Sequence, residues 1–197
     1  YYPATFTGEK VMLDVTEAIE NRRSIRQYTD APISQDTMDR LISLAVKAPT
    51  GSGMEPWGFV ILRDRAEIDA LSDRAKKEIL DHMADYPQFT QYETWLKNPK
   101  YNIFNHAGTV LVIYGDTRSH WHVYDCSLVA GNIMLLAESE GIGCCWIGFA
   151  EAVLNTVEFK KAHNVPDHFE LVSTISMGYS NSKLKPATRR PPMIFSK

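Results

Sequence analysis

Two kinds of apolar pattern divide the chain into predicted helices and strands. Between Ser34 and Pro49, apolar residues recur at intervals of three and four, which is the spacing of one helix face. They are Met38, Leu41, Ile42, Ala45 and Ala48. This helix should end before Pro49, because a residue that precedes proline is disfavoured in the helical conformation. Thr109 to Gly115 is instead a short continuous apolar run, TVLVIYG, which predicts a strand buried on both faces.

The same patterns predict further helices over residues 15–21, 65–83, 123–140 and 151–162, and further strands over 57–63, 144–149 and 169–178. Helices and strands therefore alternate, without repeats or low-complexity segments. We expect one α/β or α+β domain over residues 1–197, with a central sheet covered by helices. Residues 183–197 form a polar tail that contains proline.

Residues 86–105 stand out because six of these twenty residues are aromatic, against 11% in the whole chain. The six are Tyr86, Phe89, Tyr92, Trp95, Tyr101 and Phe104. Such enrichment between two elements suggests a lid, or a segment packed against a partner. Ordinary core aromatics are an equally good interpretation.

Composition narrows the class of protein. The chain has 21 Lys and Arg against 24 Asp and Glu, a net charge of −3, which argues against the broad basic face of a nucleic-acid binder. Three cysteines, an odd number, do not make a disulfide framework and suggest a reducing compartment. No apolar run approaches the roughly 18 residues needed to span a bilayer. We therefore expect a cytoplasmic protein without nucleic-acid or membrane partners.

Familiar catalytic motifs are missing from the sequence. There is no nucleophile elbow, no Walker-type phosphate loop and no dinucleotide fingerprint. His120 and His122, expected on one side of an extended strand, make a poor metal site even with Cys126. Cys144 and Cys145 should point to opposite faces of a strand and serve as small buried apolar residues. Any difficult chemistry would then belong to a cofactor.

The segment NRRSIRQY brings Arg22, Arg23, Ser24 and Arg26 into five consecutive positions. The planar fork of arginine fits phosphate oxygens two at a time, and a serine hydroxyl adds a donor. The segment is therefore a candidate phosphate site. A solvated surface turn is the alternative from spacing alone.

Four blocks taken together resemble the FMN-dependent nitroreductase family. They are RRSIRQY, APTGSGMEPWGFVI, YDCSLVAGNIMLLAESEGIGCCWIGF, and VPDHFELVSTISMGYS followed by TRRP. The resemblance implies an α+β, three-layer fold whose central, mostly antiparallel sheet has helices on both faces. It also implies an intertwined homodimer, with the last strand donated to the partner and two FMN molecules at the interface.

The resemblance also assigns cofactor-binding residues. Arg22, Arg23, Ser24 and Arg26 would hold the FMN phosphate and ribityl chain, joined by Arg189 from the tail. The loop Pro49, Thr50, Gly51, Ser52 and Gly53 would reach the flavin of the other subunit. Ile147 and Gly148 would lie along the isoalloxazine ring, with a backbone N–H there donating to flavin N5. Three positions depart from the family pattern: Gly53 replaces a common asparagine, Glu55 a common glutamine, and Ala187 a common lysine.

The activity implied is transfer of two electrons from NADH or NADPH to a nitroaromatic or quinone, by a ping-pong mechanism and without a catalytic side chain. Trp95 and Phe104 are the expected acceptor contacts. One alternative is reductive dehalogenation of an iodotyrosine-like substrate, suggested by Glu55-Pro56-Trp57, with Glu78, Tyr86, Tyr92 and Lys97 as candidate contacts. Another is a non-catalytic protein that binds or senses FMN.

Overall fold

The computed structural model describes residues 13–182 and 184–196. Within them, four strands form one antiparallel sheet in the order β1-β2-β4-β3. The strands are β1 (Trp57–Leu62), β2 (Thr109–Asp116), β3 (Ile142–Trp146) and β4 (Phe169–Tyr179). All residues of β2 except Asp116 are buried, as its continuous apolar run predicts.

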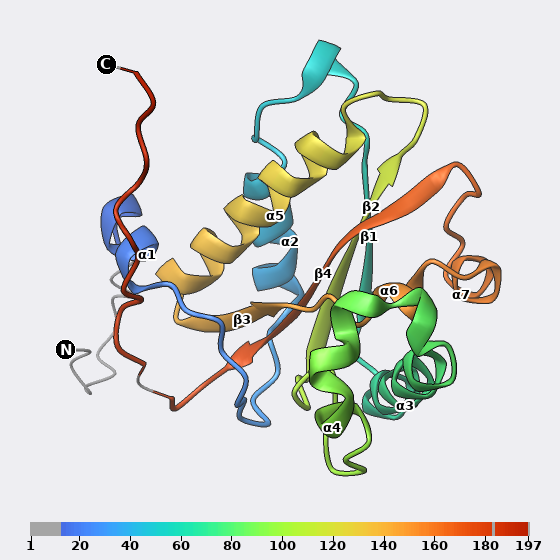
Figure 1. Cartoon of the computed structure of the whole chain (residues 1–197). Helices are drawn as coiled ribbons and strands as arrows, with labels where there is room; N and C mark the ends of the chain where they lie inside the picture. Colours follow the sequence, from blue (N-terminus) through green and yellow to red (C-terminus); the bar gives the residue numbers. More distant parts are fainter. Residues whose placement is uncertain (1–12, 183, 197) are drawn as a thin grey trace.

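Helices cover both faces of this sheet (Figure 1). On one face lie α2 (Gln35–Ala45) and α5 (His122–Ser139). On the other lie α3 (Arg65–Asp81), α4 (Glu93–Leu96), α6 (Glu151–Leu154) and α7 (Val157–Ala162). Side chains of β2 alternate between the two cores: Val110, Val112 and Tyr114 face α3, whereas Leu111 and Ile113 face α5. The predicted three-layer α+β fold is confirmed.

Local sequence signals explain where the helices begin. Asp14 and Glu17 form a reciprocal capping box at the start of α1 (Val15–Asn21). The side chains of Ser34, Asp64 and Thr156 accept from backbone N–H groups at the starts of α2, α3 and α7. Among the described helices, none is long and apolar enough to cross a membrane.

Three predicted elements differ from the structure. The helix expected over 151–162 is two helices, because Thr156 caps α7 and so starts a new one. The strand expected over 144–149 begins earlier and ends at Trp146, which leaves residues 147–149 outside the sheet. His120 and His122 do not lie on a strand: His120 is in a turn and His122 opens α5.

Short 3₁₀ turns complete the fold: η1 (Gly51–Gly53), η2 (Met83–Asp85) and η3 (Pro87–Tyr92). In Figure 1 the end of the chain extends away from the sheet, and Phe195 is 92% exposed. Residues 183 and 197 of the predicted tail, like residues 1–12 of the predicted domain, lie outside the described residues.

Candidate functional site

The arginine segment is fixed to the edge of the sheet. After α1 ends, Ser24 forms a parallel bridge with Cys144 of β3, and the Ile25 N–H donates to the Cys144 carbonyl oxygen at 3.0 Å. Gly143 makes this approach possible, since a Cβ there would lie 2.8 Å from side-chain atoms of Ile25. The backbone of the arginine segment is therefore held against β3 independently of the contacts that the arginine side chains make.

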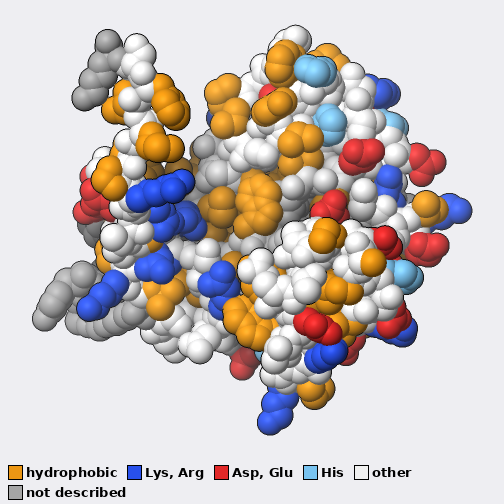
Figure 2. Space-filling view, in the orientation of Figure 1, with side chains coloured by type: hydrophobic (Ala, Val, Ile, Leu, Met, Phe, Trp, Pro, Cys, Tyr) orange, Lys and Arg blue, Asp and Glu red, His pale blue; other side chains and the backbone are white. Residues whose placement is uncertain are grey.

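The arginine side chains have no ion-pair partner among the residues that the structure describes. Within the described residues, none of Arg22, Arg23 and Arg26 forms an ion pair. Arg23 donates to the Lys185 carbonyl oxygen, and Arg26 Nη1 lies 3.4 Å from the Ser24 carbonyl oxygen. Figure 2 shows Lys and Arg side chains gathered on this part of the surface. Concentrated positive charge of this kind attracts an anion.

One carboxyl group lies within the electrostatic reach of Arg22. Burial raises the pKa of Glu138, in the last turn of α5, and the nearby Arg22 guanidinium partly offsets that rise. Arg22 therefore lies at the C-terminal end of α5. Arg189 is exposed in the tail, and its Nη1 contacts only the neighbouring Thr188 carbonyl oxygen, at 3.4 Å, among the described residues. The tail that carries Arg189 begins beside the arginine segment, since Arg23 donates to the Lys185 carbonyl oxygen.

The two residues directly after β3, Ile147 and Gly148, differ in how their backbone N–H groups are used. The Ile147 N–H donates to the Thr174 carbonyl oxygen at 2.8 Å, so it is already used. Gly148 is exposed, and its N–H has no hydrogen-bond partner among the described residues. A Cβ at Gly148 would meet nothing within 4 Å. Of the two residues predicted beside the flavin ring, only Gly148 has a backbone N–H without a hydrogen-bond partner among the described residues.

The aromatic segment packs around the next residue, Phe149. The Phe149 ring lies 4.9 Å from that of Phe89, 5.4 Å from that of Tyr92 and 6.4 Å from that of Tyr101. Burial raises the pKa of Tyr101, and the Arg26 guanidinium partly offsets that rise. The aromatic segment thus reaches both the open Gly148 and the arginine segment.

The two predicted acceptor contacts have different positions. Trp95 is 58% exposed and lies 6.2 Å, ring to ring, from Tyr101. Phe104 is 0% exposed, inside the core between the sheet and α3. The prediction that Phe104 contacts the acceptor is wrong, because a side chain fully enclosed by its own core presents no surface. The core interpretation of residues 86–105 therefore applies to Phe104, whereas the lid interpretation stays a prediction.

The loop predicted to touch the flavin, Pro49–Gly53, lies elsewhere. Thr50 Oγ1 donates to Asp125 Oδ2 at 2.9 Å, and the Gly51 N–H donates to both Asp125 oxygens, at 3.1 and 3.0 Å. Asp125 is in the first turn of α5, whereas Glu138, which faces Arg22, is in the last. They are thirteen positions apart along the helix, or about 20 Å at 1.5 Å per residue. One chain does not bring the loop and the arginine segment together.

The residues suggested as substrate contacts of a dehalogenase do not all lie together, and two of them already have ion-pair partners. Lys97 already pairs with Glu93 at 2.6 Å, and Glu78 pairs with His82 at 3.1 Å. Tyr86 and Tyr92 belong to the aromatic segment, and the pKa of Tyr86 is raised by burial and by Glu78. Glu55 follows the loop at the other end of α5.

Sequence reasoning missed three residues that shape this region. Phe149 organises the aromatic segment, Asp125 holds the loop, and the Tyr28 hydroxyl lies 2.7 Å from the Ile25 carbonyl oxygen and 3.0 Å from Ser176 Oγ. Phe149 follows Gly148 directly, and that adjacency could have indicated it. For Asp125, an acidic residue inside an otherwise apolar helix was the available signal.

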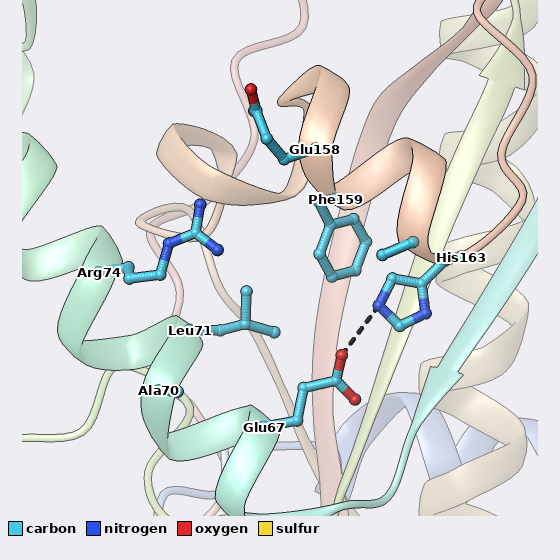
Figure 3. Close-up of a pocket in the computed structure, with 8 residues that line it drawn as sticks. Glu67, Ala70, Leu71, Arg74, Glu158, Phe159 and His163 are labelled. Carbon is cyan, nitrogen blue, oxygen red and sulfur yellow. Dashed lines mark ion pairs between the residues drawn. The ribbon is translucent and has the colours of Figure 1, made fainter.

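A separate cavity of about 280 Å³ lies between α3 and α7 (Figure 3). Glu67 and His163 form an ion pair across it at 2.9 Å. Leu71 and Phe159 supply apolar walls, while Arg74 and Glu158 stand at its rim. None of the predicted cofactor residues lines this cavity.

Comparison with known proteins gives consistent matches. The sequence model described as "Nitroreductase family" matches residues 19–179. An NADH dehydrogenase of Thermus thermophilus is 22% identical over 198 residues, covering 91% of this chain and 93% of that protein. The structure of a nitroreductase with bound FMN from Bacteroides fragilis superposes with a TM-score of 0.81, at 23% identity, covering 94% of this chain and 99% of that one. Iodotyrosine deiodinase 1 of Rattus norvegicus is 40% identical over 48 residues, 24% of this chain and 17% of that protein.

Proposed function

This chain belongs to the nitroreductase family, and from that premise we propose that it is an FMN-dependent oxidoreductase. It transfers two electrons from NADH or NADPH to a flat conjugated acceptor, a nitroaromatic or a quinone. Bound FMN supplies the redox chemistry, since its ring accepts a hydride equivalent and passes two electrons on. The protein supplies binding, orientation and the electrostatic surroundings.

The arginine segment fits the charged end of FMN. A phosphate monoester carries about −1.5 to −2 charges near neutral pH. Arg22, Arg23 and Arg26 offer three guanidinium groups without ion pairs among the described residues, and Ser24 adds a hydroxyl. Arg189 would join them from the tail. Charge-assisted bonds to phosphate are about twice as strong as neutral ones, so this set is well suited to anchor the cofactor.

The observation that carries the proposal is the open N–H of Gly148. It belongs to an exposed residue beside the aromatic cluster around Phe149, and no side chain covers the Cβ position of Gly148. A backbone donor in this place can bond to flavin N5 and favour negative charge on the reduced ring. The Ile147 side chain, next along the chain, would line the same ring while its N–H stays bonded to Thr174.

The loop Pro49–Gly53 completes the site from a second copy of the chain. Within one chain it lies at the far end of α5 from the arginine segment. At its N-terminal end, next to this loop, α5 leaves Tyr124 and Leu128 exposed, and Trp121, just before the helix, extends this stripe at helical spacing. An apolar stripe of this kind marks an interaction surface. Homodimerisation through α5 would cover the stripe and bring each loop to the partner's cofactor.

The acceptor would lie against the aromatic segment. Trp95 is the exposed aromatic side chain there, and Tyr92, 5.6 Å from it, extends the surface. Flat conjugated molecules stack on such faces. The electron donor and the acceptor would bind in turn at this one aromatic surface, which would give ping-pong kinetics.

Steady-state turnover tests this proposal. Purified, FMN-loaded protein should oxidise NADH or NADPH when menadione or nitrofurazone is added, with parallel double-reciprocal plots. Protein that holds FMN but shows no acceptor-dependent oxidation would instead be a flavin-binding or sensing protein.

Reductive dehalogenation is a second candidate, favoured by the 48-residue match to the rat deiodinase. Lys97, however, is already paired with Glu93, so it would have to exchange partners to hold a substrate carboxylate. Quenching of flavin fluorescence by iodotyrosine would support this candidate, and unchanged fluorescence would remove it.

A further inference from the structure

Asp125 is a buried carboxylate whose bonds all serve one loop. It is 4% exposed, and its two oxygens accept from the Thr50 hydroxyl and the Gly51 N–H. Thr50 Oγ1 in turn accepts from the Glu55 N–H at 3.0 Å. Within the described residues, Asp125 forms no ion pair with a cation. A buried charge without a counter-ion is costly, so its hydrogen bonds must offset that cost.

The loop that Asp125 holds is strained. Ser52 and Glu55 have φ values of 57° and 47°, in the left-handed region that residues with a Cβ seldom adopt. Gly53, with φ of 62°, tolerates that region. Such a conformation persists only where neighbouring groups over-determine it.

The back of the loop is fixed by contact as well. A Cβ at Gly51 would lie 2.4 Å from ring atoms of Trp121, so the loop backbone lies directly on this indole. Trp121 precedes α5, and Asp125 is in its first turn. The exposed stripe that we assign to the subunit interface begins at the same Trp121.

We propose that Asp125 is a positioning residue that acts between subunits: it holds the loop of its own chain in the shape that contacts the partner chain's FMN. This inference rests on the proposed function. In this arrangement the start of α5 contributes both to the subunit interface, through Trp121, and to the cofactor site, through the loop that Asp125 holds. The residue touches neither FMN nor acceptor itself.

Asp125→Asn is the direct test because it keeps the size of the side chain. The Thr50 hydroxyl and the Gly51 N–H both donate, and an amide nitrogen cannot accept from either. We expect the dissociation constant of FMN to rise by about tenfold or more. The matched control is Asp116→Asn, since Asp116 also accepts several hydrogen bonds, all from Arg118, and should leave FMN affinity unchanged.

A mixed dimer separates action between subunits from simple local damage. One chain carries Arg22→Ala, the other Asp125→Asn, and two different tags allow purification of the mixed species. If Asp125 serves the partner's FMN, one site contains both changes and the other contains neither. Titration with FMN, followed by flavin fluorescence, should then give one FMN per two chains at wild-type affinity.

If Asp125 served only its own subunit, each site of the mixed dimer would carry one defect and no wild-type site would remain. That result would overturn the inference, as would an Asp125→Asn homodimer with unchanged FMN affinity. Should Asp125→Asn fail to fold, Thr50→Val replaces it in the same mixed dimer with the same two outcomes. Failure of the wild-type protein to bind FMN would instead overturn the proposed function.

Discussion

At the C-terminal end of α5, the polar groups of the candidate site lack bonded partners among the described residues, whereas at the N-terminal end the buried Asp125 is bonded to the half-buried Thr50 and Gly51. Arg22 and Arg26 have no ion pair among the described residues, and the Gly148 N–H has no partner there. Asp125 and Thr50, by contrast, bond mutually inside the fold. The first end has the properties of a ligand-binding surface, and the second those of a rigid support. Both are needed only if two copies of the chain build one site.

The largest effect should come from removing the charges at the open end. Replacing both Arg22 and Arg26 by alanine removes two charge-assisted contacts to phosphate. Each is worth roughly 1.5–3 kcal/mol, so FMN affinity should fall by about 100-fold or more. Isothermal titration with FMN measures this. Arg74→Ala is the control, since Arg74 lines the cavity between α3 and α7, which none of the predicted cofactor residues lines. Unchanged affinity in the double variant would mean that the phosphate binds elsewhere.

Placing a charge on the exposed apolar stripe at the start of α5 should separate the subunits. Tyr124 is 64% exposed and lies in the centre of the apolar stripe on α5. Tyr124→Asp should give a folded monomer that loses FMN, because each site would lack its second loop. Light scattering and the visible spectrum report both properties. Val157→Asp is the control, as Val157 is also an exposed apolar residue but on α7. A monomer that retains FMN at wild-type affinity would contradict the claim that two chains build each FMN site.

Two glycines near the open end should respond differently to alanine. At Gly143 a Cβ would overlap Ile25, so Gly143→Ala should lower the free energy of unfolding by about 1–3 kcal/mol. At Gly148 a Cβ meets nothing, so Gly148→Ala should leave the apoprotein as stable as wild type while weakening FMN binding. Urea unfolding of apoprotein and FMN titration separate the two effects. Unaltered FMN binding by Gly148→Ala would show that this space is not used.

The smallest expected effect is a change in the free energy of unfolding at alkaline pH. It comes from the buried thiols, which lie in the core and not at either end of α5. Burial raises the pKa of Cys126 and of Cys144 to about 12. An unfolded thiol ionises near pH 8.5, so from about pH 9 upwards the unfolded chain holds fewer protons than the folded one. The free energy of unfolding should therefore fall as the pH rises through this range. Urea unfolding at a series of alkaline pH values checks the sign, and a rise in stability would contradict it.

Much of the scaffold could be predicted because its signals are local. The apolar run of β2, the helical spacing in α2 and the alternation of Cys144 and Cys145 between two cores all follow from neighbouring residues. The arginine segment was visible as a cluster in the sequence. Its attachment to β3 was not, because Ser24 and Cys144 are distant in the chain and no local rule pairs them.

The wrong and missing site predictions concern residues whose burial or contacts depend on tertiary packing. Phe104 and Trp95 have the same aromatic character in sequence, yet one is enclosed in the core and the other is exposed. Nothing local distinguishes them. Asp125 was overlooked for the same reason: its importance comes from Thr50 and Gly51, which lie more than seventy positions earlier in the chain.

The central claim is that two chains together hold the flavin, and size-exclusion chromatography with light scattering and absorbance near the visible flavin band tests it most directly. The account predicts flavin absorbance that elutes only with the mass of two chains, at one FMN per chain. Flavin that elutes at the mass of a single chain, or protein that stays colourless after incubation with excess FMN, would contradict it.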